Sequence, residues 1–292
     1  MLVNKAVLDD LYRGLKSNFQ DGFGAFEPKW NKIATMINST SASEIYNWLG
    51  DWPQMREWIG DRRIKQLEAH GYTIRNRKFE STIKVMRDDI EDDSIGIVAP
   101  KVQSLGQIAA EHPDQLIFEL LASGFVELCY DGQPFFDAEH PVGDGLVSNL
   151  QAGSDLPWFL LDTRRPLKPL IYQKRRDYQF RALNNLEDQN AFMRDEFLFG
   201  VDARSSAGFG FWQMAYGSRA ALTAENFKLA RAAMKKFEGD EGRKLNVNPN
   251  VIVVGPGNLD AAETLFATAT LANGAGNTLY KAVEIIESTL LD

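Results

Sequence analysis

Residues 101–124 carry the longest amphipathic helical pattern in the chain, and no other feature constrains the fold as strongly. Apolar side chains recur there at the i, i+3, i+4 spacing of one helix face, namely Leu105, Ile108, Ala109, Leu116, Ile117, Leu120 and Leu121. Pro113 lacks an amide hydrogen and predicts a kink or a restart of the helix. Gly124 predicts its end.

The N-terminal part combines a regular helix with an irregular aromatic segment. One face of a predicted helix over residues 4–20 carries Leu8, Leu11, Leu15 and Phe19. Gly22 and Gly24 predict the end of that helix. Residues 25–58 are aromatic but show little periodicity, so we expect an arm that needs another surface to pack against. Its tryptophans are Trp30, Trp48, Trp52 and Trp58.

Residues 72–87 alternate like two β-strands. The polar run from Arg75 to Lys78 between them predicts a turn, and therefore a β-hairpin. A two-stranded hairpin is marginal in water by itself. We expect this one to pack on another sheet or on another subunit.

Charge is segregated around this predicted hairpin. Basic residues dominate residues 60–87, namely Arg62, Arg63, Lys65, Arg75, Arg77, Lys78, Lys84 and Arg87. An acidic run follows directly, namely Asp88, Asp89, Glu91, Asp92 and Asp93. Two interpretations stay open: two solvated faces, or a basic stretch of one copy meeting the acidic stretch of another. The net charge of −8 argues against tight, sequence-independent DNA binding.

The second half predicts further strands and helices. Apolar runs at 158–161 and 170–172 indicate strands. Residues 200–219 mix glycine with aromatic side chains and indicate bulged strands or a close-packed loop. Thr223 is a predicted N-cap of a helix over 223–238. A buried strand at 251–254 leads into an Ala-rich helix over about 258–272.

The sequence VELCYDGQPFFDAEHPV, residues 126–142, gathers Cys129, Asp131, Asp137, Glu139 and His140. Asp-Gly at 131–132 is a strong turn signal. The other two histidines lie far away in sequence, and neither H-E-x-x-H nor C-x-x-C occurs. We therefore predict a structural turn. A metal-dependent enzyme using Asp131, Asp137, Glu139 and His140 is a remaining alternative.

Other chemical motifs are weak or missing. The acidic run at 88–96 lacks the glycine and the final glutamate of a calcium loop. In VIVVGPGNLDAA, Asp260 stands where a dinucleotide site needs its third glycine. We expect no catalytic, cofactor-binding or metal-binding residue. One cysteine, no apolar leader and no run of 18 apolar residues lead us to expect synthesis in a reducing cytoplasm and no membrane span.

Five blocks resemble, in order, the gpT-type major head subunit of Mu-like phages and prophages. They are WNKIATMINSTSASEIYNWLGDWPQMREWIGDRR, YTIRNRKFESTIKVMRDDIEDD, CYDGQPFFDAEHP, PWFLLDTRRPLKPLIYQKRR and FGVDARSSAGFGFWQMAYGSR. The resemblance implies an α+β fold, the Hong Kong 97-like capsid fold. Its parts would be an N-terminal arm at 1–50, an extended β-hairpin loop region at 51–100, a peripheral domain at 101–222 with a spine helix at 101–124, and an axial domain at 223–292.

The resemblance also implies a function. The chain would assemble with identical subunits into hexamers and pentamers of an icosahedral shell around double-stranded DNA, with the arm and the hairpin lying across neighbouring subunits. Portal, scaffold or protease and decoration proteins are expected partners, with only weak contact to packaged DNA. The shell would be assembled in the host bacterial cytoplasm and would belong to the virion. A nanocompartment shell that encloses an enzyme is the alternative. The assembly-interface candidates are Trp48, Trp52, Trp58, Arg62, Arg63, Arg75, Arg77, Lys78, Asp88, Asp89, Asp92 and Asp93.

Overall fold

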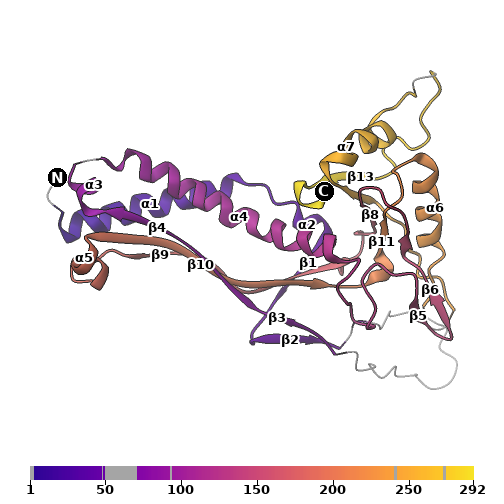
Figure 1. The fold of residues 1–292 in the computed structure, drawn as a ribbon, viewed down its shortest axis with the longest axis horizontal. Helices are drawn as coiled ribbons and strands as arrows, with labels where there is room; N and C mark the ends of the chain where they lie inside the picture. The colour runs from indigo at the N-terminus through magenta and orange to yellow at the C-terminus, as the bar shows by residue number, and fades with distance from the viewer. Residues whose placement is uncertain (1–2, 48, 50–70, 93, 240–241, 272–273) are drawn as a thin grey trace.

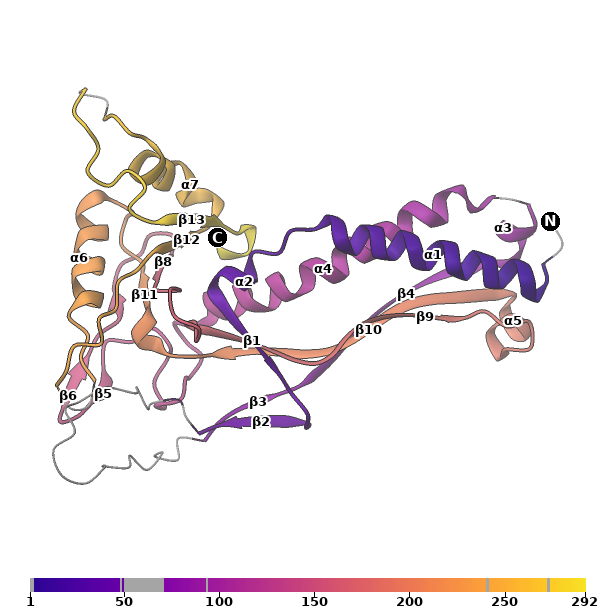
Figure 2. The same cartoon turned by 180° about the vertical axis from the view of Figure 1, so that it is seen from behind.

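The computed structural model describes residues 3–47, 49, 71–92, 94–239, 242–271 and 274–292. Figures 1 and 2 show an elongated part, built from long strands under two helices, which joins a more compact part at one end. No helix in the described ranges is both long enough and apolar enough to cross a membrane.

The elongated part is a four-stranded sheet with two helices on one face (Figure 1). The sheet order is β1 (Ala34–Asn38), β9 (Leu170–Leu183), β10 (Glu196–Phe209) and β4 (Arg77–Met86). Pairing is parallel between β1 and β9 and antiparallel elsewhere. The register shifts around Arg204 of β10, so the predicted bulge within 200–219 is confirmed.

The two covering helices are α1 (Lys5–Ala25) and α4 (Val98–Ser123). α1 buries Leu8, Leu15 and Phe19 against the same core that receives Phe199 of β10 and Leu105 of α4. The first helix of the predicted arm, α1, packs on α4 of its own chain, and this contact buries the apolar face of α1.

α4 confirms the long helix predicted at 101–124, with two corrections. The helix runs continuously through Pro113, so it does not restart there. Ile108, counted on the buried face, is 57% exposed. Gly124 is the C-cap as predicted. A Cβ at Gly124 would lie 2.8 Å from the Phe136 ring, so glycine permits the close approach of the following turn.

Gly22 and Gly24 lie within α1 and do not end it. A Cβ on Gly22 would lie 1.9 Å from the backbone oxygen of Gln103 in α4. A Cβ on Gly106 would lie 2.2 Å from the backbone oxygen of Phe19 in α1. Each helix therefore presents a glycine to the backbone of the other, and this mutual contact explains why Gly22 and Gly106 are glycines.

The hairpin predicted at 72–87 is wrong. β3 (Tyr72–Arg75) pairs with β2 (Ser43–Tyr46), whereas β4 pairs with β10, so the two consecutive strands join different sheets. Asn76 between them is buried. Its side chain donates to Ser39 Oγ at 2.7 Å and accepts from Gln173 Nε2 at 2.9 Å. The predicted turn is thus an internal link, and β4 belongs to the chain's own sheet.

The compact part contains a five-stranded sheet in the order β13, β12, β8, β11 and β7. Its strands are β7 (Leu150–Gln151), β8 (Trp158–Leu161), β11 (Ala215–Ser218), β12 (Val251–Val254) and β13 (Glu284–Glu287). The strands predicted at 158–161 and 251–254 are confirmed, and both are buried along their whole length. The large core of this part includes Trp158, Phe227 and Phe266.

Helices α6 (Ala224–Lys235) and α7 (Pro256–Ala262) pack against this sheet. Thr223 Oγ1 accepts from the Asn226 amide at 3.2 Å, which confirms the predicted N-cap of α6. The Ala-rich helix is shorter than predicted. After α7 a single π-helical segment, Glu263–Ala267, completes it, and the chain leaves helical geometry at Thr268. The remaining elements are α2 (Trp30–Ile33), α3 (Arg87–Glu91), α5 (Gln189–Arg194), β5 (His140–Val142) and β6 (Gly145–Val147).

Candidate functional site

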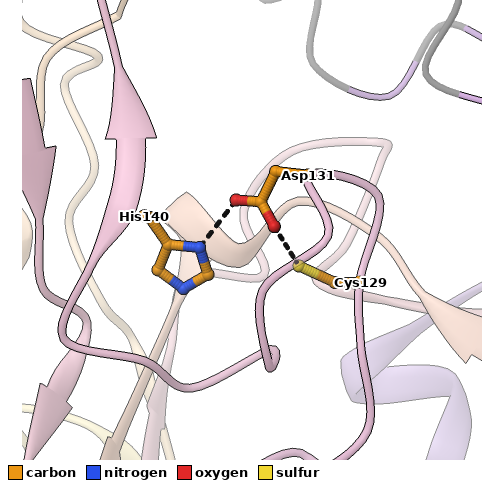
Figure 3. Close-up of side chains that lie close together, drawn as sticks. All are labelled: Cys129, Asp131 and His140. Carbon is orange, nitrogen blue, oxygen red and sulfur yellow. Dashed lines mark hydrogen bonds and ion pairs between the residues drawn. The ribbon is translucent and has the colours of Figure 1, made fainter. Parts of the chain in front are cut away.

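The turn after α4 brings Cys129, Asp131 and His140 together, as Figure 3 shows. His140 Nδ1 lies 2.7 Å from Asp131 Oδ2, and Cys129 Sγ donates to Asp131 Oδ1 at 3.0 Å. The Gln133 amide donates to the same oxygen at 3.1 Å. Gly132 has a φ of 85°, a left-handed conformation that glycine adopts without strain. The predicted Asp-Gly turn is confirmed.

His140 is fully buried, and its ring stacks on Trp212 with 4.0 Å between ring centroids. Its Nε2 lies 3.1 Å from Asn149 Oδ1. Asn149 Nδ2 donates to the Phe135 carbonyl at 2.8 Å, which identifies the atom facing His140 as the amide oxygen. Both ring nitrogens therefore lie within hydrogen-bond distance of a side-chain oxygen.

The pKa values in this turn follow from burial and hydrogen bonding. Burial would raise the pKa of Asp131, but the hydrogen bonds from His140 and Cys129 outweigh it and hold that pKa below its ordinary value. Burial, together with the Asp131 charge, raises the pKa of the Cys129 thiol. The thiol is therefore protonated at neutral pH and is a poor nucleophile.

One ligand atom from each of Cys129, Asp131 and His140 lies within 4.8 Å of the others, close enough for a common metal ion. Each donor is already satisfied by another member of the turn, however. Asp137 and Glu139, the other residues of the metal-enzyme alternative, do not join them. Asp137 Oδ1 accepts from the Glu139 amide at 2.8 Å instead. The geometry is that of a buried polar turn that holds the end of α4 to the compact part.

Half of the assembly-interface candidates lie within the described residues. Trp48, Trp52, Trp58, Arg62, Arg63 and Asp93 lie outside them. The side chains that are described are all exposed, namely Arg75, Arg77, Lys78, Asp88, Asp89 and Asp92.

The basic and acidic candidates lie at opposite ends of β4. Lys78 and Met86 are eight strand positions apart, which at roughly 3.3 Å per residue places Lys78 about 26 Å from the start of α3. Charge pairing between the two groups within one molecule is therefore excluded by distance. Two other basic residues of this region form ion pairs within the subunit: Arg87 with Glu91 at 2.9 Å and Lys84 with Glu196 at 3.9 Å.

Strand alternation separates two candidates that the predicted turn had placed together. The Arg77 guanidinium lies 5.3 Å from the centre of the Phe79 ring, on the sheet face that α4 covers, where Phe79 contacts His112. Burial first, and then the Arg77 charge, lower the pKa of His112. Lys78 projects to the opposite, open face. Arg77 and Lys78 therefore lie on opposite faces of the sheet.

Sequence reasoning missed an apolar tip at the far end of the elongated part. α5 joins β9 to β10 there, and it exposes Phe192 by 84% and Met193 by 67%. The signal was present in the sequence as adjacent apolar side chains inside the polar stretch 184–195. Exposed apolar side chains of this size, next to each other, mark interaction surfaces.

Comparisons with known proteins agree along the whole chain. A family model described as "Mu-like prophage major head subunit gpT" matches residues 8–291. The major capsid protein of Escherichia phage Mu is 45% identical over 285 residues, which cover 94% of this chain and 93% of that protein. The Mu-like prophage FluMu major head subunit of Haemophilus influenzae is 43% identical and covers 87% of each chain.

Two solved structures of bacteriophage JBD30 are also similar. Its procapsid subunit superimposes with a TM-score of 0.89 and 42% identity, covering 99% of this chain and 100% of that one. The subunit of its capsid decorated with minor capsid protein trimers gives a TM-score of 0.78 and 32% identity, with 94% of each chain covered.

Proposed function

Because this chain belongs to the family of Mu-like prophage major head subunits and is a major capsid protein with the Hong Kong 97-like fold, we propose that it self-assembles into hexamers and pentamers of an icosahedral shell around double-stranded DNA. The observation that carries the proposal is the superposition with the JBD30 procapsid subunit over nearly the entire chain. The chain is a shell protein of the virion and not an enzyme. The nanocompartment alternative is not favoured, because the relatives that match most of the chain are phage head proteins.

Self-association in this proposal buries surface that one subunit leaves exposed. The apolar tip around Phe192 and Met193 is one such surface, and the charged ends of β4 are others. Each subunit touches several neighbours, so individually weak contacts add up across a closed lattice.

The division into an arm at 1–50, an extended loop region at 51–100, a peripheral domain at 101–222 and an axial domain at 223–292 is part of this proposal. The sheet topology links regions across these borders. β1, from the first region, pairs with β9 of the third, and β2 pairs with β3 of the second. β4, from the second region, lies in one sheet with β9 and β10 of the third. β7, β8 and β11 of the third region lie in one sheet with β12 and β13 of the fourth.

The proposal also includes other proteins of the phage particle and the packaged DNA. A trimeric decoration protein on the shell is supported by the decorated JBD30 capsid. We include portal and scaffold or protease proteins, and assembly in the host cytoplasm, in the proposal. Contact with packaged DNA is weak and non-specific, because a net charge of −8 gives little counterion release.

The test is expression of the full chain, followed by negative-stain microscopy. The unmodified chain is expected to form closed shells. Replacing Arg75, Arg77 and Lys78 together with Glu is expected to leave the subunit folded by circular dichroism and to block shell formation, because all three side chains are exposed. Normal shells from this variant would contradict a role of these residues in assembly. A chain that stays monomeric at high concentration would contradict the function itself.

A further inference from the structure

The long sheet has a face that the helices leave open. Val201 and Ala203 of β10 line a cavity against α4, so the alternate residues Asp202 and Arg204 point to the other face. Figures 1 and 2 show α1 and α4 on the first face, and they show β2 and β3 beside the inner end of β4, where Ile74 of β3 lies against Gly208 of β10.

Three cations form a row across this open face. Arg204 of β10 stands directly opposite Lys78 of β4 on one side and Arg176 of β9 on the other. Directly opposed like charges destabilise a sheet, so the row is not explained by the stability of the subunit. Within the described part of the chain, Arg176 pairs with Asp202, whereas Lys78 and Arg204 have no ion pair.

Two buried donor atoms of the row also lack partners. The Nε atoms of Arg176 and Arg204 are buried and make no hydrogen bond to any described residue. Buried donors without partners are rare, since each costs free energy. Adjacent strands lie about 4.8 Å apart, so the three cationic groups are spaced to receive neighbouring carboxylates.

Matching anions lie at the other end of β4. Asp88 and Asp89 of α3, and Asp92 just after it, are exposed and make no ion pair with another described residue. They lie more than about 26 Å from Lys78 along the strand of the same molecule. A second copy of the chain can bring them to the row.

We propose that the Arg176–Arg204–Lys78 row of one subunit binds the α3 carboxylates, Asp88, Asp89 and Asp92, of a neighbouring subunit. This inference rests on the proposed shell function and names a contact within it. The contact joins two different surfaces, so it is heterologous and can close into a ring or continue through a lattice. Exposed ion pairs are individually weak, which lets misplaced subunits leave before the shell closes.

A charge swap tests the pairing. Lys78→Glu with Arg204→Glu keeps a like-charge pair across β4 and β10, and circular dichroism checks that the variant subunit is folded. This variant is expected to lower shell yield by about tenfold or more, because it places acidic side chains against the acidic side chains of α3. A second variant, Asp88→Lys with Asp89→Lys and Asp92→Lys, is expected to have the same effect, because it places lysines against the cationic row. Combining all five substitutions is expected to restore shells.

The control reverses two exposed lysines of α1, Lys5→Glu with Lys16→Glu, which changes the net charge by the same amount. Normal shell yield from this control is expected. If this control loses as much shell yield as the Lys78→Glu, Arg204→Glu variant, the change in net charge explains both losses and the proposed pairing is overturned. If the variant with all five substitutions folds but forms no shells, the proposed pairing is overturned as well. If the unmodified chain does not assemble, the proposed shell function itself is overturned.

A crosslink gives a second readout that does not depend on charge. The natural Cys129 is buried, so the pair Arg204→Cys and Asp89→Cys places the reactive thiols at the proposed contact. Oxidised shells are expected to run as a ladder of linked subunits on a non-reducing gel, and single-cysteine variants as monomers. A disulfide needs Cα atoms within about 7 Å, closer than an arginine–aspartate pair requires, so absence of the ladder both on oxidation and with a longer bis-maleimide crosslinker would overturn the contact. The Lys78→Glu, Arg204→Glu variant has one further informative outcome. If it forms normal shells that retain less DNA, this face of the sheet binds nucleic acid and not α3 of a neighbouring subunit, and the proposed pairing is overturned.

Discussion

At the scale of single residues, Asp131 ties three parts of one turn together. Its carboxylate accepts from His140, from Cys129 and from the Gln133 amide. The side chain is only 7% exposed, so a charge at this position depends on all of these partners. Cys129, Asp131 and His140 are residue types that often carry chemistry. In this chain they hold the turn after the C-terminal end of α4 in place.

Asp131→Asn is expected to destabilise the subunit by about 3 kcal/mol at pH 7, because it replaces the buried carboxylate that accepts from His140, Cys129 and the Gln133 amide. The folded state holds the pKa of Asp131 below its ordinary value of about 3.9. Stability from this group is therefore present above that value and is lost as the pH falls through the lower, folded-state pKa. The difference between the variant and the parent should shrink below about pH 4.

Urea unfolding at pH 7 and pH 3 measures this difference. Asp137→Asn is the matched control. Among the described residues the Asp137 carboxylate accepts only from the Glu139 amide, so this change should cost no more than about 1 kcal/mol. Equal effects of the two substitutions at pH 7, or a difference as large at pH 3 as at pH 7, would argue against the hydrogen-bonded Asp131 carboxylate.

At the scale of elements, the two helices of the elongated part touch through glycine. Gly106 and Gly22 each lie against the backbone of the other helix, so the helices meet without intervening side chains at this point. A glycine inside a helix normally costs about 1 kcal/mol relative to alanine. Here that cost is offset by the packing of α1 on α4.

Gly106→Ala is expected to destabilise the subunit by several kcal/mol, because a Cβ there would overlap the Phe19 backbone of α1. Gly14→Ala in α1 is the control. A Cβ at Gly14 meets nothing within 4 Å, so this change should stabilise by up to about 1 kcal/mol. Thermal unfolding separates the two. A stabilising Gly106→Ala would mean that α1 does not pack on α4 in solution.

At the scale of the whole molecule, the elongated part ends in an apolar tip far from the compact part (Figure 1). Phe192 and Met193 of α5 are mostly exposed there, and the acidic helix α3 lies close by, linked through the Arg87–Asp195 ion pair at 3.6 Å. A subunit of a shell has neighbours to cover such a tip, whereas an isolated protein would gain nothing from it.

Phe192→Ser is expected to change subunit stability by less than about 0.5 kcal/mol, since the side chain is 84% exposed. It should raise the concentration needed for shell assembly by about tenfold, because burying a phenylalanine between subunits is worth about 1.5–3 kcal/mol. Phe192→Leu keeps an apolar side chain and should retain most assembly. Light scattering against subunit concentration measures both, and an unchanged threshold for Phe192→Ser would place the tip outside the interfaces.

The sequence by itself determined the features that local physics controls. The spacing of apolar side chains predicted α1, α4 and α6, Thr223 predicted the start of α6, and Asp-Gly predicted the turn after α4. Only the tertiary structure decided which strands pair. β3 and β4 are consecutive and alternate correctly, yet each has a partner from a distant part of the chain, because alternation fixes which side chains share a face but not which strand lies alongside. For the same reason the row of Arg176, Arg204 and Lys78 exists only after three strands are in register.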